Sequence, residues 1–113
     1  MKNSNAINDK VFDLFKILRK YPLMILTKDS SYFLLQNYIE GYVDGLSLIL
    51  NKNMRQEITQ WYKKKINTQT TYYWTGHIPF HFKEKDDHKL KEILLDITEQ
   101  YFRENPDWYK PSS

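Results

Sequence analysis

Cysteine is absent from this sequence of 113 residues, and glycine and proline are scarce, at three and four residues. A chain without cysteine has no thiol nucleophile, no thiolate metal ligand and no disulfide, which fits a reducing compartment. Three glycines are too few for the glycine-rich loops that hold phosphate groups. These absences exclude disulfide-stapled domains, cysteine enzymes and glycine-loop nucleotide-binding proteins.

Long apolar runs are also missing. The longest runs extend over only a few residues, whereas a helix needs about 20 to cross a bilayer. The first 15 residues lack the continuous apolar region of a secretion signal. We therefore expect no membrane association and a cytoplasmic location.

Hydrophobic residues are nevertheless plentiful. They make up 41% of the chain, and aromatic residues make up 16%. A chain of this length and composition can bury a core without metals or disulfides, so we expect one compact domain over residues 1–113. With so many rings, some should remain at the surface, where tyrosine and tryptophan favour contact with a partner.

The spacing of apolar residues predicts a mostly α fold with about four helices. Capping residues and prolines place the helices near residues 8–20, 30–50, 53–66 and 86–104. Residues 68–82 contain β-leaning side chains, Gly76 and Pro79, so we expect one irregular or short extended segment there. Residues 23–26 are interpreted as a buried connector rather than a strand. Residues 1–6 and 107–113 are expected to be flexible or peripheral.

Two glycines fall inside the second predicted helix. Gly41 and Gly45 are four residues apart and therefore share a face. Each costs about 1 kcal/mol of helix propensity relative to alanine. Their presence predicts that another element packs too closely on this face to leave room for a side chain.

The three histidines are candidate metal ligands or catalytic groups. His77 and His81 flank Pro79 outside any predicted helix, so their spacing of four residues does not guarantee alignment. Asp86 and Asp87 precede the last predicted helix and are expected to cap it. The sequence therefore predicts no catalytic residue, no metal site and no cofactor, and an enzyme that uses these histidines stays a third possibility.

The net charge of +3 is mild, but the charges are unevenly distributed. Between Asp29 and Leu50 every charged residue is acidic, whereas a basic cluster with nearby rings follows. The sequence therefore offers two candidate partner-binding surfaces, one acidic and one basic and aromatic. The acidic set comprises Glu40 and Asp44, and the basic and aromatic set comprises Lys63, Lys64, Tyr72 and Tyr73.

Several elements follow one another in a distinctive order across most of the chain. They are Pro22, Met24, Ser30 or Ser31, Leu35, Ile39, Gly41, Tyr42, Trp61, Trp74, Ile78 and the predicted helix around residues 90–102. This order resembles the pattern of a bacterial immunity family that accompanies contact-dependent growth inhibition and related polymorphic toxins, although Tyr21 and Ile25 depart from the family pattern.

The resemblance implies a protein that binds its cognate toxin C-terminal domain one to one and blocks the active site of that toxin, expected to be a nuclease. Such an inhibitor needs no catalytic residue, cofactor or small-molecule substrate. The residues that contact the partner vary between family members, so the two candidate surfaces come from this sequence alone. The alternative is a small nucleic-acid-binding or regulatory module that uses Lys63, Lys64 and Lys65 with Tyr72, Tyr73 and Trp74 for phosphate contacts and stacking.

Overall fold

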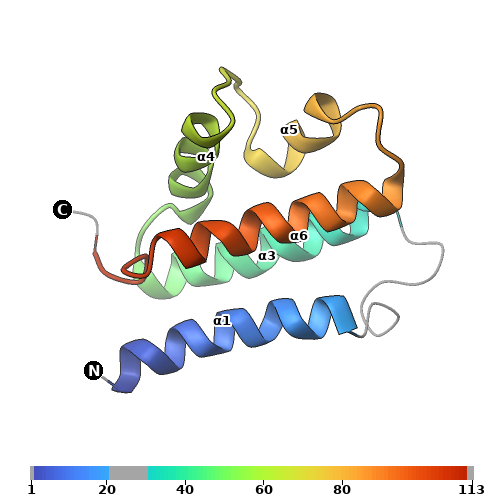
Figure 1. The fold of residues 1–113 in the computed structure, drawn as a ribbon. Helices are drawn as coiled ribbons and strands as arrows, with labels where there is room; N and C mark the ends of the chain where they lie inside the picture. The colour runs from blue at the N-terminus through green and yellow to red at the C-terminus, as the bar shows by residue number, and fades with distance from the viewer. Residues whose placement is uncertain (1, 21–30, 112–113) are drawn as a thin grey trace.

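The computed structural model describes residues 2–20 and 31–111, which form a compact, mostly helical domain (Figure 1). Within these ranges there are five helices and no strand. The helices are α1 (Lys2–Lys20), α3 (Tyr32–Leu50), α4 (Met54–Lys65), α5 (Trp74–His81) and α6 (Asp87–Glu104). The prediction of a mostly α domain is confirmed, with one helix more than the expected number.

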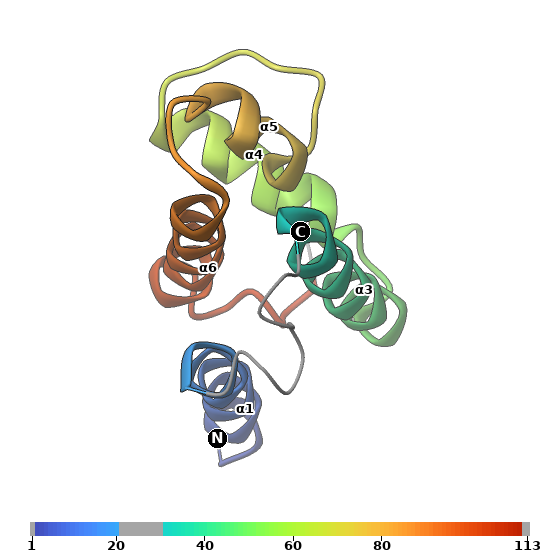
Figure 2. The same cartoon turned by 90° about the vertical axis from the view of Figure 1, so that its right-hand side faces the viewer.

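The helix α6 is the centre of the arrangement, because it packs against each of the other four. Viewed end-on in Figure 2, α3 and α6 lie side by side beneath α4 and α5. The helix α1 packs against α6 at the opposite end of the molecule from α5 (Figures 1 and 2). None of the described helices is both long and apolar enough to span a membrane.

The core takes side chains from all five helices. On α3 the buried face is formed by Tyr32, Leu35, Ile39 and Val43. The spacing of Leu35, Ile39 and Ile49 predicts that Ile49 shares this face, but 82% of its surface is exposed and the prediction is wrong. Most of α3 is apolar on all sides, so periodicity alone could not fix which side faces inward.

The helix α5 occupies a segment for which irregular structure was expected. Pro79 lies inside it and cannot donate a hydrogen bond to the carbonyl of Thr75, four residues earlier. The buried hydroxyl of Tyr32 donates to that carbonyl instead, at 2.7 Å. The helix α5 therefore depends on tertiary packing, because a side chain of α3 bonds the carbonyl that the proline leaves free.

The two glycines of α3 also contradict the sequence-based expectation. A Cβ atom built at Gly41 or Gly45 would meet nothing within 4 Å. The prediction that a neighbouring element closes onto this face is wrong. Both glycines lie on the outward side of the helix.

Regular or packed structure extends into both ends of the described chain. Residues 2–6 belong to α1, which begins at Lys2 rather than near residue 8. Near the C-terminus, Trp108 is 3% exposed and packs on Phe102, with ring centroids 5.0 Å apart. Its indole N–H donates to Asn8 Oδ1 at 2.7 Å. The tail residue Trp108 is therefore part of the core. The predicted connector at 23–26 lies outside the described residues.

Candidate partner-binding surface

Arg55 organises the polar centre of one face of the molecule. Its Nε and Nη2 atoms donate to the two carboxylate oxygens of Asp44, each at 2.7 Å. Its Nη1 atom lies 3.7 Å from Glu40 Oε1. The hydrogen bonds from Arg55 hold the pKa of Asp44 below its usual value. The two acidic residues predicted as a candidate surface are thus joined by one guanidinium group.

The connection between α3 and α4 brings these residues together. Asn51 ends α3 in the left-handed conformation, with φ of 54°, which asparagine tolerates better than most residues. The side chain of Ser47 then accepts from the backbone N–H of Met54 at 2.9 Å, and Asn53 caps α4 by accepting from Gln56 N–H. This tight reversal places the first turn of α4 beside the middle of α3.

Glu40 is held more firmly than a surface carboxylate. Its side chain is 17% exposed and accepts hydrogen bonds from the hydroxyl of Thr75 and from Gln36 Nε2. Thr75 is itself fully buried in α5. Glu40 therefore ties α3 to α5, and Asp44, half exposed at 49%, is the carboxylate that remains available to a partner.

Exposed rings adjoin this polar centre. The guanidinium carbon of Arg55 lies 5.4 Å from the ring centroid of Tyr73, within the range of a cation–π contact. The rings of Tyr72 and Phe80 lie beside each other with centroids 6.4 Å apart. Tyr73, Tyr72 and Phe80 are 43%, 56% and 67% exposed. We call Asp44, Arg55, Tyr72, Tyr73 and Phe80 the aromatic surface.

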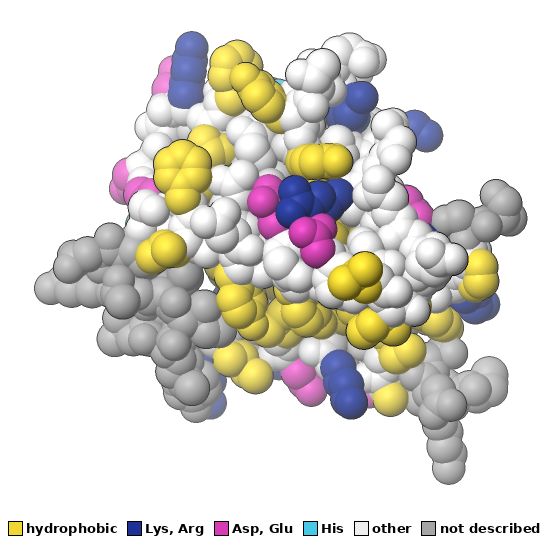
Figure 3. Space-filling model, turned by 180° about the vertical axis from the view of Figure 1, so that it is seen from behind, with side chains coloured by type: hydrophobic (Ala, Val, Ile, Leu, Met, Phe, Trp, Pro, Cys, Tyr) yellow, Lys and Arg dark blue, Asp and Glu magenta, His cyan; other side chains and the backbone are white. Residues whose placement is uncertain are grey.

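Figure 3 shows the molecule from behind, with basic and acidic side chains grouped near the centre of the face and hydrophobic side chains around them. Tyrosine and arginine are among the residues that most often carry binding energy at protein interfaces. A guanidinium group fixed by two carboxylates and a ring also loses little conformational freedom when a partner arrives. The arrangement suits contact with another macromolecule.

The lysines of the second candidate set are divided by the structure. Lys63 lines a hollow of about 350 Å³ together with Tyr72 and Tyr73. Lys64 is exposed and does not line this hollow. Lys65 forms an ion pair with Glu104 at 2.7 Å. The structure therefore joins Glu40, Asp44 and Tyr73 through Arg55 and places Lys63 beside them.

Arg55, which connects the two candidate sets, was not predicted from the sequence. Its partner Asp44 lies eleven residues earlier, across a helix end and a turn. Such a spacing has no recognisable pattern, because it depends on the angle at which α4 leaves α3. The sequence contains one weak indication of this ion pair. All charged residues of α3 are acidic, and Arg55 is the first basic residue of the helix that follows, α4.

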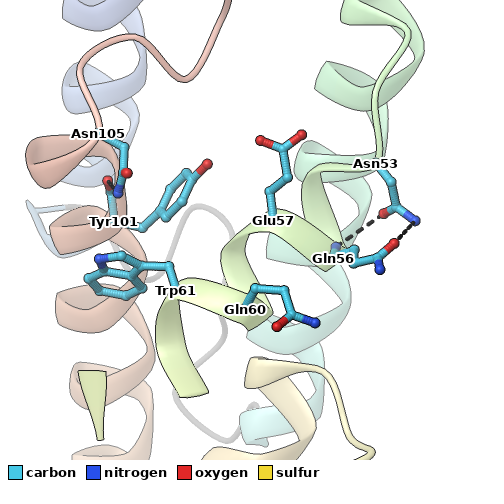
Figure 4. A pocket seen from close by; sticks show the side chains of 7 residues that line it. All are labelled: Asn53, Gln56, Glu57, Gln60, Trp61, Tyr101 and Asn105. Carbon is cyan, nitrogen blue, oxygen red and sulfur yellow. Dashed lines mark hydrogen bonds between the residues drawn. The ribbon is translucent and has the colours of Figure 1, made fainter. Parts of the chain in front are cut away.

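A second hollow lies between α4 and α6 (Figure 4). Its volume is about 410 Å³. Burial raises the pKa of Tyr101 to about 12, so its hydroxyl stays protonated at neutral pH. Asn53 and Gln56 already bond to each other, as the dashed lines in Figure 4 show. The hollow can form hydrogen bonds and contact rings, but a single carboxylate offers no acid–base pair. Its lining consists of Asn53, Gln56, Glu57, Gln60, Trp61, Tyr101 and Asn105.

The histidines are spread over different environments. His77 is buried and its Nδ1 atom lies 2.6 Å from the hydroxyl of Tyr62. The ring of His81 lies 5.4 Å from that of His77, while His88 is exposed near the start of α6. Within residues 2–20 and 31–111, no group of three or more histidine, aspartate or glutamate side chains is placed to hold a metal ion.

Comparison with known protein families, curated proteins and solved structures finds no match to this chain. The resemblance to the immunity family therefore stays an expectation from the sequence.

Proposed function

We propose that this chain is an immunity protein that binds a cognate bacterial toxin domain one to one in the cytoplasm and covers its active site. The aromatic surface is the observation that supports this function best. It combines three exposed rings with an arginine held in place by Asp44 and Glu40. A preorganised surface of this composition can bind tightly without any reactive group.

The charge of this surface limits the kind of toxin that fits. Glu40 is engaged by Thr75 and Gln36 and lies near Arg55, so the surface is less acidic than the sequence predicts. Asp44 still presents a half-exposed carboxylate, which can meet a basic side chain in a nucleic-acid cleft. A nuclease is therefore the toxin class that we propose, with the rings supplying most of the affinity.

The proposal is tested by the neighbouring reading frame and by coexpression. A large secreted protein with a variable C-terminal domain encoded immediately upstream supplies the toxin domain for the assay. The chain should copurify with that domain and restore growth when the two are coexpressed. Absence of such a neighbour, or growth arrest that the chain does not relieve, would contradict the proposal.

Variants locate the interface. Changing Tyr73→Ala together with Phe80→Ala removes two exposed rings and should weaken toxin binding at least tenfold, since interface hot spots contribute about 2 kcal/mol or more each. The control is Ile17→Ala on α1, which removes a 44% exposed apolar side chain at the other end of the molecule. It should leave the affinity unchanged.

A nucleic-acid-binding module is the second candidate, and one observation favours it. Lys63 shares its hollow with Tyr72 and Tyr73, which offers a phosphate contact beside stacking rings. A gel shift with single-stranded RNA or DNA that weakens with salt and disappears after Lys63→Ala with Lys64→Ala would support it. No shift at low salt would remove this candidate.

A further inference from the structure

The hollow beside the aromatic surface is built between α4 and the segment that follows it. Residues 66–73 fold back along α4 because hydrogen bonds hold them near both ends. The backbone N–H of Thr68 donates to the carbonyl of Lys63 at 3.0 Å. At the other end, the backbone N–H of Trp74 donates to the hydroxyl of buried Thr59 at 3.2 Å. The two walls of the hollow are therefore tied together by the fold.

The lining of this hollow contains hydrogen-bond donors and one cation. From α4 come two amides and an ammonium group, those of Gln56, Gln60 and Lys63. The opposite wall adds the hydroxyls of Thr70 and Thr71. Among the described residues, no aspartate or glutamate lines the hollow. Amides, hydroxyls and ammonium groups can all donate to an anion, so the composition suits a negatively charged group.

The ammonium group of Lys63 has no counterion within the described ranges. Elsewhere on α4, Arg55 is paired with Asp44 and Lys65 is paired with Glu104, whereas Lys63 forms no ion pair with a carboxylate of residues 2–20 or 31–111. The carbonyl of Lys63 at the end of the helix is already satisfied by the backbone that follows. A half-buried cation without a counterion is therefore directed to a hollow of donors.

We propose that this hollow accepts one carboxylate side chain, from an aspartate or a glutamate, of the toxin domain. The inference rests on the proposed function and names the chemistry of the partner at the edge of the aromatic surface. A single lysine matches the single charge of a carboxylate, whereas a nucleic-acid strand presents a row of phosphates and is bound by several cations. The composition therefore favours an acidic side chain of a protein.

The aromatic surface then presents charges of both signs in a fixed order. Tyr73 lines the hollow next to Lys63, its ring lies 5.4 Å from the guanidinium carbon of Arg55, and Arg55 holds Asp44. A partner that places an acidic group against Lys63 must place a basic group against Asp44. The opposite orientation would bring like charges together, which costs affinity. The two charges thus fix how the toxin domain is turned on this surface.

Sodium acetate tests the hollow without the toxin. It is titrated into the isotope-labelled chain at constant ionic strength, with sodium chloride making up the balance, and followed by nuclear magnetic resonance. The side-chain amide signals of Gln56 and Gln60 should shift and saturate at about 10 to 100 mM, as expected for one charge-assisted contact. The shifts should disappear in Lys63→Gln and persist in Lys16→Gln, which changes an exposed lysine of α1. Shifts that do not saturate, or that are equal in both variants, overturn the anion site.

Calorimetric titration with the toxin domain tests the occupant. Lys63→Glu should weaken binding by about tenfold or more, because the toxin carboxylate then meets a like charge. Lys16→Glu makes the same change of net charge on α1 and should bind like the unchanged chain. Reversing the matching acidic residue of the toxin domain to lysine should restore the affinity of Lys63→Glu. If Lys63→Glu and Lys16→Glu bind the toxin equally well, the inference is wrong.

The inference and the immunity function fail in different ways. If the unchanged chain does not bind the toxin domain, the immunity function is wrong and the toxin carboxylate is overturned with it. If the chain binds the toxin domain regardless of Lys63, only the inference is contradicted. Binding of a single-stranded oligonucleotide that Lys63→Glu abolishes, while toxin binding stays intact, would assign the hollow to a phosphate and overturn the carboxylate.

Discussion

His77 illustrates how single polar side chains are held in this core. It is 4% exposed, and its Nδ1 atom contacts the hydroxyl of Tyr62, which is itself fully buried. Burial, with a smaller contribution from His81, lowers the pKa of His77 below its ordinary value of 6.5. The neutral imidazole is therefore the form that the folded protein prefers.

This preference predicts a pH dependence of stability. The unfolded chain binds a proton at His77 more readily than the folded chain, so the contribution to stability is complete above about pH 6.5 and declines as the pH falls through the lowered pKa. The free energy of unfolding, measured with urea near pH 7.5 and near pH 5.5, should change less between these two pH values in His77→Gln than in the unchanged protein. The control His88→Gln alters an exposed histidine and should keep the full difference. If the free energy of unfolding changed equally with pH in all three proteins, the pH dependence would not come from His77.

Arg55 gives a second prediction for single residues. In Arg55→Gln, the pKa of Asp44 should rise toward its ordinary value, because the hydrogen bonds that lower it are gone. A carboxyl titration followed by nuclear magnetic resonance measures this shift. The free energy of unfolding should fall by about 1 kcal/mol. Lys89→Gln, which removes an exposed ion pair with Glu92, is the matched control and should change little. An unaltered Asp44 titration would refute the arrangement.

At the scale of secondary-structure elements, the sequence predicted the ends of α3, α4 and α6 well. Asp86 caps α6 as expected, because its side chain accepts the backbone N–H three residues later, and Asn53 caps α4 in the same way. These signals are local, and local physics determines where such helices start. The helix α5 was not predictable in the same way, because its proline is compatible with a helix only when Tyr32 from another element bonds Thr75.

In the candidate site, too, the features set by local sequence were predictable and those set by tertiary packing were not. The sequence indicated Glu40, Asp44, Tyr72 and Tyr73 as surface candidates, but it could not show that Glu40 is tied to α5 or that Arg55 joins the set. Those relations depend on how α3, α4 and α5 cross. Pairings between side chains on different elements are set by tertiary packing, which no local pattern encodes.

Substitution of the glycines of α3 tests whether the outward side of this helix is open. Since a side chain at Gly41 would enter open space, Gly41→Ala should raise the free energy of unfolding by about 1 kcal/mol through better helix propensity. The change is measured by urea unfolding. Gly45→Ala, also in open space, should behave alike. A loss of stability in both would restore the idea that another element packs closely there.

At the scale of the whole molecule, the C-terminal tail ties distant parts together. Asn8 of α1 accepts from the indole of Trp108 and donates to the carbonyl of Pro106. Lys52, between α3 and α4, donates to the carbonyl of Trp108 at 2.8 Å. Since the packing partner of α1 among the described helices is α6, the tail supplies an additional link between α1 and the rest of the fold.

Removal of this link should be costly. Trp108→Ala leaves a cavity in the core and takes away the hydrogen bond to Asn8, so we expect the free energy of unfolding to fall by about 3 to 5 kcal/mol. Tyr109→Ala changes a neighbouring ring that is only half-buried and should cost clearly less. Urea unfolding of the two variants measures both values. Similar small losses would show that the tail is peripheral after all.

The central claim is that this helical domain works by covering another protein with its aromatic surface. The most direct measurement is calorimetric titration of the purified chain into the toxin domain encoded beside it. The account predicts one-to-one binding that weakens at least tenfold in the Tyr73→Ala, Phe80→Ala variant and is unchanged in Ile17→Ala. No heat of binding, or an affinity that both variants share with the unchanged protein, would contradict it.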